Sequence, residues 1–168
     1  MVGPTEDFEE WYRAVHPRLG TALAYAFGDV EVAQDAADEA VARAFERWDQ
    51  VSAMASPAGW TYRVAFNVAR RRLRRRSIEA RLLGSTVPGT VGPPAGELWD
   101  IVAALPPRQR RAVLLRHVGQ LEEHEIGRVM GITRGTVSST LRAAYRSLRM
   151  ELEEVPAVPA ITRTREIR

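Results

Sequence analysis

Histidine is the side chain best suited to bind a metal or transfer a proton near neutral pH, and this chain has three: His16, His117 and His124. Their separations match no metal-ligand spacing, and the His124-Glu125 pair alone is weak support for one. The absence of cysteine excludes thiolate ligands, a thiol nucleophile and disulfides. No phosphate-binding glycine loop and no supported set of serine, histidine and aspartate is present. We therefore predict no catalytic residue, no metal site and no cofactor, and a protein that is not an enzyme.

The polar residues between 122 and 149 suggest a different chemistry. A short amphipathic segment is followed by Gly131, by Thr133 in a capping position, and by a longer segment in which arginine, serine and threonine recur. The apolar residues are spaced so that two helices pack together and these polar groups face outward. This pattern is typical of a helix-turn-helix whose second helix enters the major groove of DNA, with an ordinary helical hairpin as the alternative. The predicted DNA contacts are Arg134, Thr136, Ser138, Ser139, Arg142 and Arg146.

The net charge of +3 is small, but it is unevenly distributed. Residues 1–59 hold 4 arginines and 11 acidic residues, whereas residues 60–81 hold 8 arginines and one glutamate. Residues 108–152 hold 9 arginines and 4 acidic residues. Six arginines within residues 70–76 repel one another and favour a polyanion, although a solvated basic helix end is the alternative. Two basic segments, each after an acidic one, indicate two surfaces that contact a polyanion.

Helical periodicity accounts for most of the chain, and no alternating strand pattern of useful length is present. We predict helices over residues 8–27 with a bend at His16-Pro17, over 30–48, from Ser56-Pro57 to about 76, and over 98–105, 108–118, 122–130 and 134–152. The glycine- and proline-rich stretch 84–96 is typical of a linker. The predicted fold is all-α, with two small helical domains at residues 1–80 and 97–152. A flexible linker, residues 81–96, joins them, and residues 153–168 are predicted to be a disordered tail.

Composition and the N-terminal sequence limit the location of the protein. Its apolar content of 45% argues against disorder. No apolar run approaches the length of a membrane span, and MVGPTEDFEEW lacks the basic and apolar regions of a signal peptide. We therefore expect a folded cytoplasmic protein with no membrane insertion.

The C-terminal half resembles a known family. The stretch DIVAALPPRQRRAVLLRHVGQL, then Glu-Ile, Gly-Ile-x-x-Gly-Thr-Val and an arginine-rich helix with Leu148, resembles region 4 of bacterial RNA polymerase sigma factors. The match is to the sigma-70 family, in its extracytoplasmic-function (SigE-like) group. The resemblance implies that the helix-turn-helix residues named above bind the minus-35 promoter element.

The first half is similar to region 2 of the same family. AQDAADEAVARAFERW (33–48) looks like region 2.2, which grips the clamp helices of the largest polymerase subunit. The implied polymerase contacts are Asp35, Asp38, Glu39, Arg43 and Phe45, with a solvated acidic face as the alternative. SPAGWTYRVAFNVARRRLRRR (56–76) resembles regions 2.3 and 2.4, which engage the melting minus-10 DNA with help from the preceding loop, here about 49–55. The implied minus-10 contacts are Trp60, Tyr62, Arg63, Asn67, Arg70, Arg71 and Arg74.

The resemblance covers nearly the whole chain to residue 152 and implies its partners. These are core RNA polymerase (the largest-subunit clamp helices and the flap), double-stranded and melted promoter DNA, and an anti-sigma factor. Catalysis would belong to the polymerase. The alternatives are a free-standing helix-turn-helix transcriptional regulator that never binds polymerase, and a helical enzyme that uses its histidines. Trp11, Trp48 and Trp99 are expected in the core, whereas Trp60 is either core or a base-stacking platform.

Overall fold

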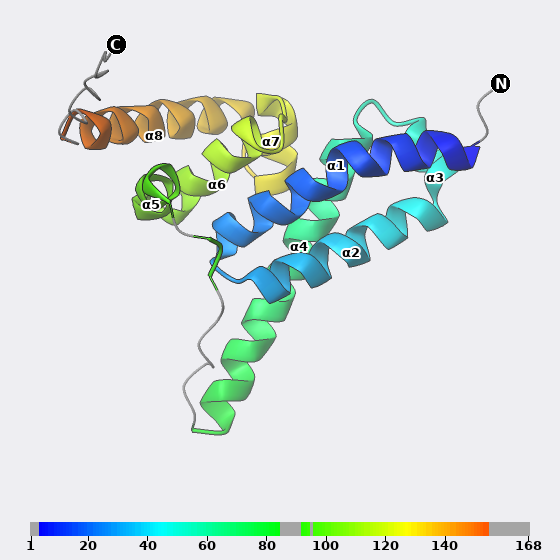
Figure 1. Ribbon diagram of the computed structural model, residues 1–168, viewed down its shortest axis with the longest axis horizontal. Coiled ribbons are helices and arrows are strands. Elements are labelled where there is room, and N and C mark those ends of the chain that lie inside the picture. Colours follow the sequence, from blue (N-terminus) through cyan, green and yellow to red (C-terminus); the bar gives the residue numbers. More distant parts are fainter. Residues whose placement is uncertain (1–3, 85–91, 95, 155–168) are drawn as a thin grey trace, which may run out of the picture.

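The computed structural model describes residues 4–84, 92–94 and 96–154, and every regular element within these ranges is an α-helix (Figure 1). The helices are α1 (Pro4–Phe27), α2 (Val30–Glu46), α3 (Trp48–Ser52), α4 (Pro57–Leu82), α5 (Glu97–Ala104), α6 (Pro107–His117), α7 (Glu123–Met130) and α8 (Arg134–Glu154). The predicted all-α fold is confirmed. Half of the predicted linker, residues 85–91 and 95, and the tail beyond Glu154 lie outside the described residues.

Helices α1, α2 and α4 pack against one another and form the N-terminal module, defined here as residues 4–84. Helix α1 ends before Gly28, whose left-handed backbone (φ +70°) costs glycine little. Asp29 then starts α2, because its carboxylate accepts a hydrogen bond from the Val32 amide at 2.9 Å. Helix α2 turns small side chains toward its neighbours, which lets the helices approach closely. These are Ala33, Ala36, Ala37, Ala40 and Ala44.

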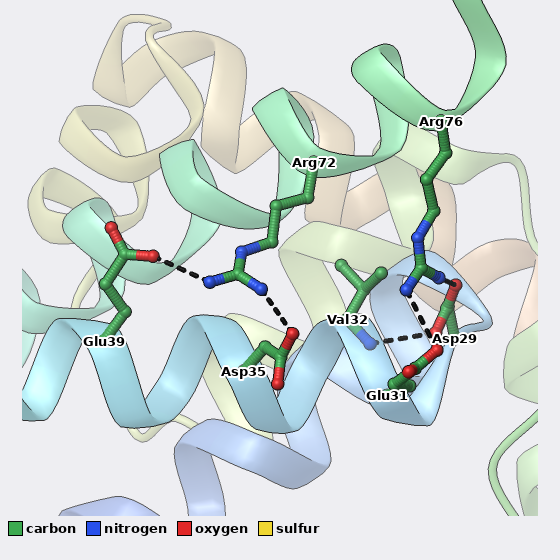
Figure 2. Close-up of polar contacts among 7 residues, drawn as sticks. All are labelled: Asp29, Glu31, Val32, Asp35, Glu39, Arg72 and Arg76. Atoms are coloured by element: carbon green, nitrogen blue, oxygen red, sulfur yellow. Dashed lines mark hydrogen bonds and ion pairs between the residues drawn. The ribbon is translucent and has the colours of Figure 1, made fainter. Parts of the chain in front are cut away.

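Helix α4 is longer than predicted. It begins as expected, since Ser56 Oγ accepts a hydrogen bond from the Gly59 amide at 2.9 Å and Pro57 lies in the first turn. It continues to Leu82 rather than ending near residue 76, and so enters the segment predicted as linker. Arginines in its second half pair with carboxylates on α2 and at its start, and these pairs stabilise the extra turns (Figure 2). The periodicity of one segment cannot predict such contacts between two helices.

The prediction of a loop from about residue 49 was wrong, because α3 occupies Trp48–Ser52. Val51 is fully buried and Trp48 partly buried. A spacing of three residues brings both to one face of a single helical turn, which packs on α1, α2 and α4. Only the end of the predicted loop, up to Ala55, remains non-helical.

Helices α5 to α8 form the C-terminal module, defined here as residues 96–154. The turn between α7 and α8 uses Gly131, which has a left-handed backbone (φ +70°). Thr133 Oγ1 accepts a hydrogen bond from the Thr136 amide at 3.2 Å and caps α8 as predicted. A Cβ on Gly127 would lie 2.8 Å from the Ile132 carbonyl oxygen, so the turn can close only over glycine. Together these features set the angle of the helix-turn-helix.

The two modules pack against each other, with α6 and α7 lying on α1 and α4. The rings of Tyr25 and Trp99 stack with their centroids 4.1 Å apart. The guanidinium carbon of Arg111 lies 5.0 Å from the centroid of the Phe27 ring. We call this the closed arrangement.

Replacing Tyr25 by alanine is expected to loosen the closed arrangement. Tyr25 stacks on Trp99 of the C-terminal module and donates a hydrogen bond from its hydroxyl to the carbonyl of Pro94, just before that module, at 2.9 Å. Their loss should increase the radius of gyration measured by small-angle X-ray scattering. Tyr12→Ala is the matched control, because Tyr12 lies on the same helix and stacks on His16 within the N-terminal module. An unchanged radius in a folded Tyr25→Ala variant would show that this stack does not hold the modules together.

Candidate nucleic-acid interface

The outer face of α8 presents the side chains that the sequence assigned to DNA. All six come from this one helix and none is buried. Arg142 and Arg146 are exposed and one helical turn apart, whereas the apolar face carrying Val137 and Leu141 is buried against the rest of the module. The helix-turn-helix therefore leaves a row of arginine, serine and threonine side chains at the surface, where a groove can reach them. The remaining members of the row are Arg134, Thr136, Ser138 and Ser139.

The carboxylate of Glu123, which was not among the predicted site residues, lies against this row. Ser138 Oγ donates a hydrogen bond to Glu123 Oε2 at 2.6 Å, and Arg134 Nε lies 3.5 Å from the same oxygen. The hydrogen bond from Ser138, and then the contact with Arg134, hold the pKa of Glu123 below its usual value. The sequence contained one indication of this contact: Glu123 is an acidic residue in the first turn of the helix that was predicted to pack on α8.

A second basic surface lies on α4. Asn67, Arg70 and Arg71, all exposed, line a hollow of about 440 Å³ together with Val64 and with Arg43 of α2. The structure therefore brings Arg43, assigned from the resemblance to polymerase binding, next to residues assigned to DNA. Within the described ranges no carboxylate pairs with Arg70, Arg71 or Arg74, so their charge is available to a polyanion.

Trp60 and Arg63 line a smaller hollow, of about 310 Å³, between the end of the 49–55 segment and α7. Met54 and Ser56 contribute one wall of this hollow, and Arg128 of α7 contributes another. The position of Trp60 at a hollow rather than in the core agrees with its interpretation as a stacking platform, which stays a prediction. Because α7 belongs to the C-terminal module, the closed arrangement narrows access to this hollow.

Tyr62 is enclosed in the closed arrangement. Its side chain is 1% exposed, and burial raises the pKa of its hydroxyl. A Cβ added to Gly119 would lie 3.1 Å from the Tyr62 ring, so this stretch of the C-terminal module rests on the tyrosine. Nearby, Arg18 donates a hydrogen bond to Gln120 Oε1 at 2.5 Å. The C-terminal module therefore covers part of Tyr62 in the closed arrangement.

Several acidic residues on one side of α2, and Asp29 just before it, are engaged by arginines of α4 (Figure 2). Arg72 pairs with Asp35 and, at 2.9 Å, with Glu39. Arg76 pairs at 3.0 Å with Asp29 and at 2.9 Å with Glu31, both near the start of α2. Two of the six clustered arginines therefore stabilise the N-terminal module rather than face a ligand.

The other residues predicted to bind polymerase remain on the surface. Asp38 is exposed and its carboxylate lies 2.8 Å from His16 Nε2. Phe45 is 57% exposed, with its ring centroid 4.8 Å from that of Phe8. An exposed phenylalanine beside an aromatic cluster is a suitable anchor for a protein partner.

The histidines take part in ordinary polar contacts. His117 lies 3.0 Å from the Tyr145 hydroxyl, and His124 lies 3.3 Å from a carboxylate oxygen of Glu122. Among the residues with described positions, no three histidine or acidic side chains are grouped to hold a metal ion. In the same part of the chain, no helix is long and apolar enough to cross a membrane. Trp11 and Trp48 pack on each other with centroids 4.9 Å apart, but they are partly buried in an aromatic cluster and do not belong to the buried core predicted for them.

Together the helix-turn-helix and the arginines of α4 define a class: a helical DNA-binding protein with two basic surfaces. Residues 11–78 match the family model for sigma-70 region 2, and residues 95–148 match that for sigma-70 region 4. The chain is 32% identical over 157 residues to the RNA polymerase sigma-E factor of Streptomyces avermitilis, covering 90% of this chain and 88% of that one. It is 25% identical to the ECF RNA polymerase sigma factor SigW of Bacillus subtilis, covering 76% and 79%.

A solved structure shares the fold. The sigma factor RpoE, in its complex with the anti-sigma factor NepR from Bartonella quintana, superposes with a TM-score of 0.73 at 18% identity. The match covers 89% of this chain and 99% of that one. The chain belongs to the sigma-70 family of RNA polymerase sigma factors, in its extracytoplasmic-function group.

Proposed function

We infer that this protein associates with core RNA polymerase and directs it to particular promoters. The observation that carries this conclusion is the order of its two regions on one chain: region 2 with its arginine-rich α4, then region 4 with α8 turned outward. A free-standing regulator needs only the second region, so the presence of the first favours a sigma factor. The chain would act in the cytoplasm as a non-enzymatic initiation factor, and the polymerase would supply the chemistry.

We assign the two DNA surfaces to the two promoter elements. The α8 residues Arg134, Thr136, Ser138, Ser139, Arg142 and Arg146 would contact the minus-35 element. The α4 residues Trp60, Tyr62, Arg63, Asn67, Arg70, Arg71 and Arg74 would engage the melting minus-10 element. None of these side chains except Tyr62 is buried, and this supports the assignment, whereas Tyr62 would have to be uncovered before it could meet DNA. Residues 1–80 and 97–152 would then act as domains tethered by residues 81–96.

The polymerase would bind mainly through the exposed side of α2. Phe45 and Asp38 offer an apolar anchor and an exposed carboxylate, whereas Asp35 and Glu39 already share Arg72. The clamp helices of the largest subunit are the proposed partner for this face, with the flap as partner for the C-terminal module. Since RpoE was solved with the anti-sigma factor NepR, we also propose that an anti-sigma factor binds this chain.

Run-off transcription with core polymerase tests the proposal. The wild-type chain is expected to start transcripts at a defined promoter, because a sigma factor, unlike a repressor, gives the core enzyme a start site. The variant with alanine at His16, His117 and His124 is expected to start the same transcripts, since these side chains make only local contacts. No transcript and no association with core polymerase would refute the proposal. Loss of transcript initiation in the folded histidine variant would instead favour the alternative of a helical enzyme that uses its histidines.

A further inference from the structure

We propose that Glu123 is a positioning residue that sets the base preference of α8, because it accepts the hydrogen bond that the Ser138 hydroxyl donates. The proposal rests on the function inferred above, because it requires α8 to read the minus-35 element. Glu123 lies on α7, in the first turn of the helix that packs against α8. Its carboxylate therefore approaches the reading helix from a neighbouring element.

The direction of the hydrogen bond follows from its partners. An ionised carboxylate can only accept, so at the 2.6 Å separation the Ser138 hydroxyl donates to Glu123 Oε2. Arg134, on the first turn of α8, lies beside the same oxygen and favours the ionised form. The lowered pKa of Glu123 agrees with an ionised group at neutral pH.

A serine hydroxyl has one proton and two lone pairs. With its proton directed to Glu123, Ser138 can offer only lone pairs to a base edge. In the major groove, cytosine N4 and adenine N6 are donors, whereas guanine O6 and N7 and thymine O4 are acceptors. Ser138 held in this way should favour the amino group of cytosine or adenine and disfavour guanine or thymine at the same place.

Ser139, the neighbour of Ser138, makes no contact with Glu123 and serves as a comparison. Its hydroxyl donates at 3.0 Å to the carbonyl of Thr136, within the same helix. No change at Glu123 alters that bond, so any base contact made by Ser139 serves as an internal reference. Glu151, exposed near the far end of α8, provides a matched change of charge.

The test uses holoenzyme assembled from core polymerase and the full-length chain, with promoters randomised in the minus-35 element. Sequencing of the bound fraction first identifies the base pair at which Ser138→Ala changes the preference. At that pair the base that Ser138 contacts is the one whose major-groove group, when removed by a base analogue on that strand alone, lowers binding by the wild type but not by Ser138→Ala. That base is expected to be cytosine or adenine, and Glu123→Ala is expected to reduce the preference for it by about 3- to 10-fold. Glu123→Gln, whose amide oxygen still accepts, should retain more of the preference. Glu123→Ala should have no further effect at that pair in the Ser138→Ala background.

Glu151→Ala should leave the preference at the Ser138 pair unchanged. Alanine is the best helix former and Glu123 is partly exposed, so the variant should fold, as thermal unfolding will verify. A contact of wild-type Ser138 with guanine or thymine rather than with its amino-bearing partner would overturn the proposal. So would an equal rise in affinity for all sequences after Glu123→Ala, because Glu123 would then act only through its charge. Failure of the proposed function would look different: the holoenzyme would not initiate, and substitutions on α8 would change no base preference.

Discussion

Replacing Arg142 by alanine is expected to weaken binding to the minus-35 element by about 1–3 kcal/mol, or roughly 5- to 150-fold in the equilibrium constant. Arg142 is exposed on α8, one turn beyond Ser138. Its guanidinium makes no ion pair with any carboxylate whose position is described, so both nitrogen edges are available for a guanine N7 and O6. A lost bidentate base contact has this magnitude because the base edge is left without a partner.

The measurement is a titration of promoter DNA with holoenzyme at several salt concentrations. Arg149→Ala is the control, because Arg149 lies two turns further along α8 and is better placed for phosphates. It should weaken binding to all sequences alike and reduce the salt dependence, whereas Arg142→Ala should also relax the preference at one base pair. Equal affinity of wild type and Arg142→Ala for the cognate site would remove Arg142 from the reading surface.

Replacing Asp29 by alanine is expected to lower the free energy of unfolding by about 2–4 kcal/mol. Asp29 is only 1% exposed and does two things at once. One carboxylate oxygen caps α2 by accepting a hydrogen bond from the Val32 amide, and the other pairs with Arg76 at 3.0 Å. Alanine would leave an uncapped helix and a partly buried guanidinium whose remaining carboxylate partner is Glu31 (Figure 2).

Urea denaturation followed by circular dichroism measures this loss. Asp29→Asn should be destabilised less, because the amide oxygen can still cap α2 although its charge is gone. Asp38→Ala is the exposed control on the same helix and should change the free energy of unfolding by less than about 0.5 kcal/mol. If Asp29→Ala were as stable as Asp38→Ala, α2 would not depend on its cap.

The closed arrangement bears on when the DNA surfaces become available. The α8 row is open to solvent, but Tyr62 lies beneath the C-terminal module and the hollow at Trp60 is partly walled by α7. The proposed minus-35 surface is therefore accessible in the structure described, while part of the proposed minus-10 surface is not. Binding of both elements at once requires a partner that favours separated modules, and the polymerase is the proposed one.

Much of the local structure was predictable because its signals are local. The apolar periodicity predicted every helix except α3. Ser56-Pro57 and Thr133 cap helices through bonds to amides three residues away. The helix-turn-helix followed from Gly131 and the apolar residues around it, and the all-α fold followed from the absence of strand patterns.

The contacts between distant segments were not predictable in this way. The row Arg70 to Arg76 looks uniform in the sequence, yet Arg72 and Arg76 pair with α2 while Arg70, Arg71 and Arg74 remain unpaired. Only the rotation of α4 against α2 distinguishes them. The role of Glu123 likewise depends on which side chain of α8 faces it.

The amino-acid sequence by itself determined the helical segments other than α3 and the end of α4, the caps at Ser56 and Thr133, and that two basic surfaces follow one another along the chain. Helix propensity, apolar periodicity and capping depend on residues a few positions apart, so the sequence of one segment is enough to predict a helix there. Only the tertiary structure decided which arginines are neutralised, that Tyr62 is buried where Gly119 of the other module meets it, and that the Ser138 hydroxyl is directed to Glu123. Each of these depends on the relative rotation and spacing of packed helices, which is set by the whole core at once.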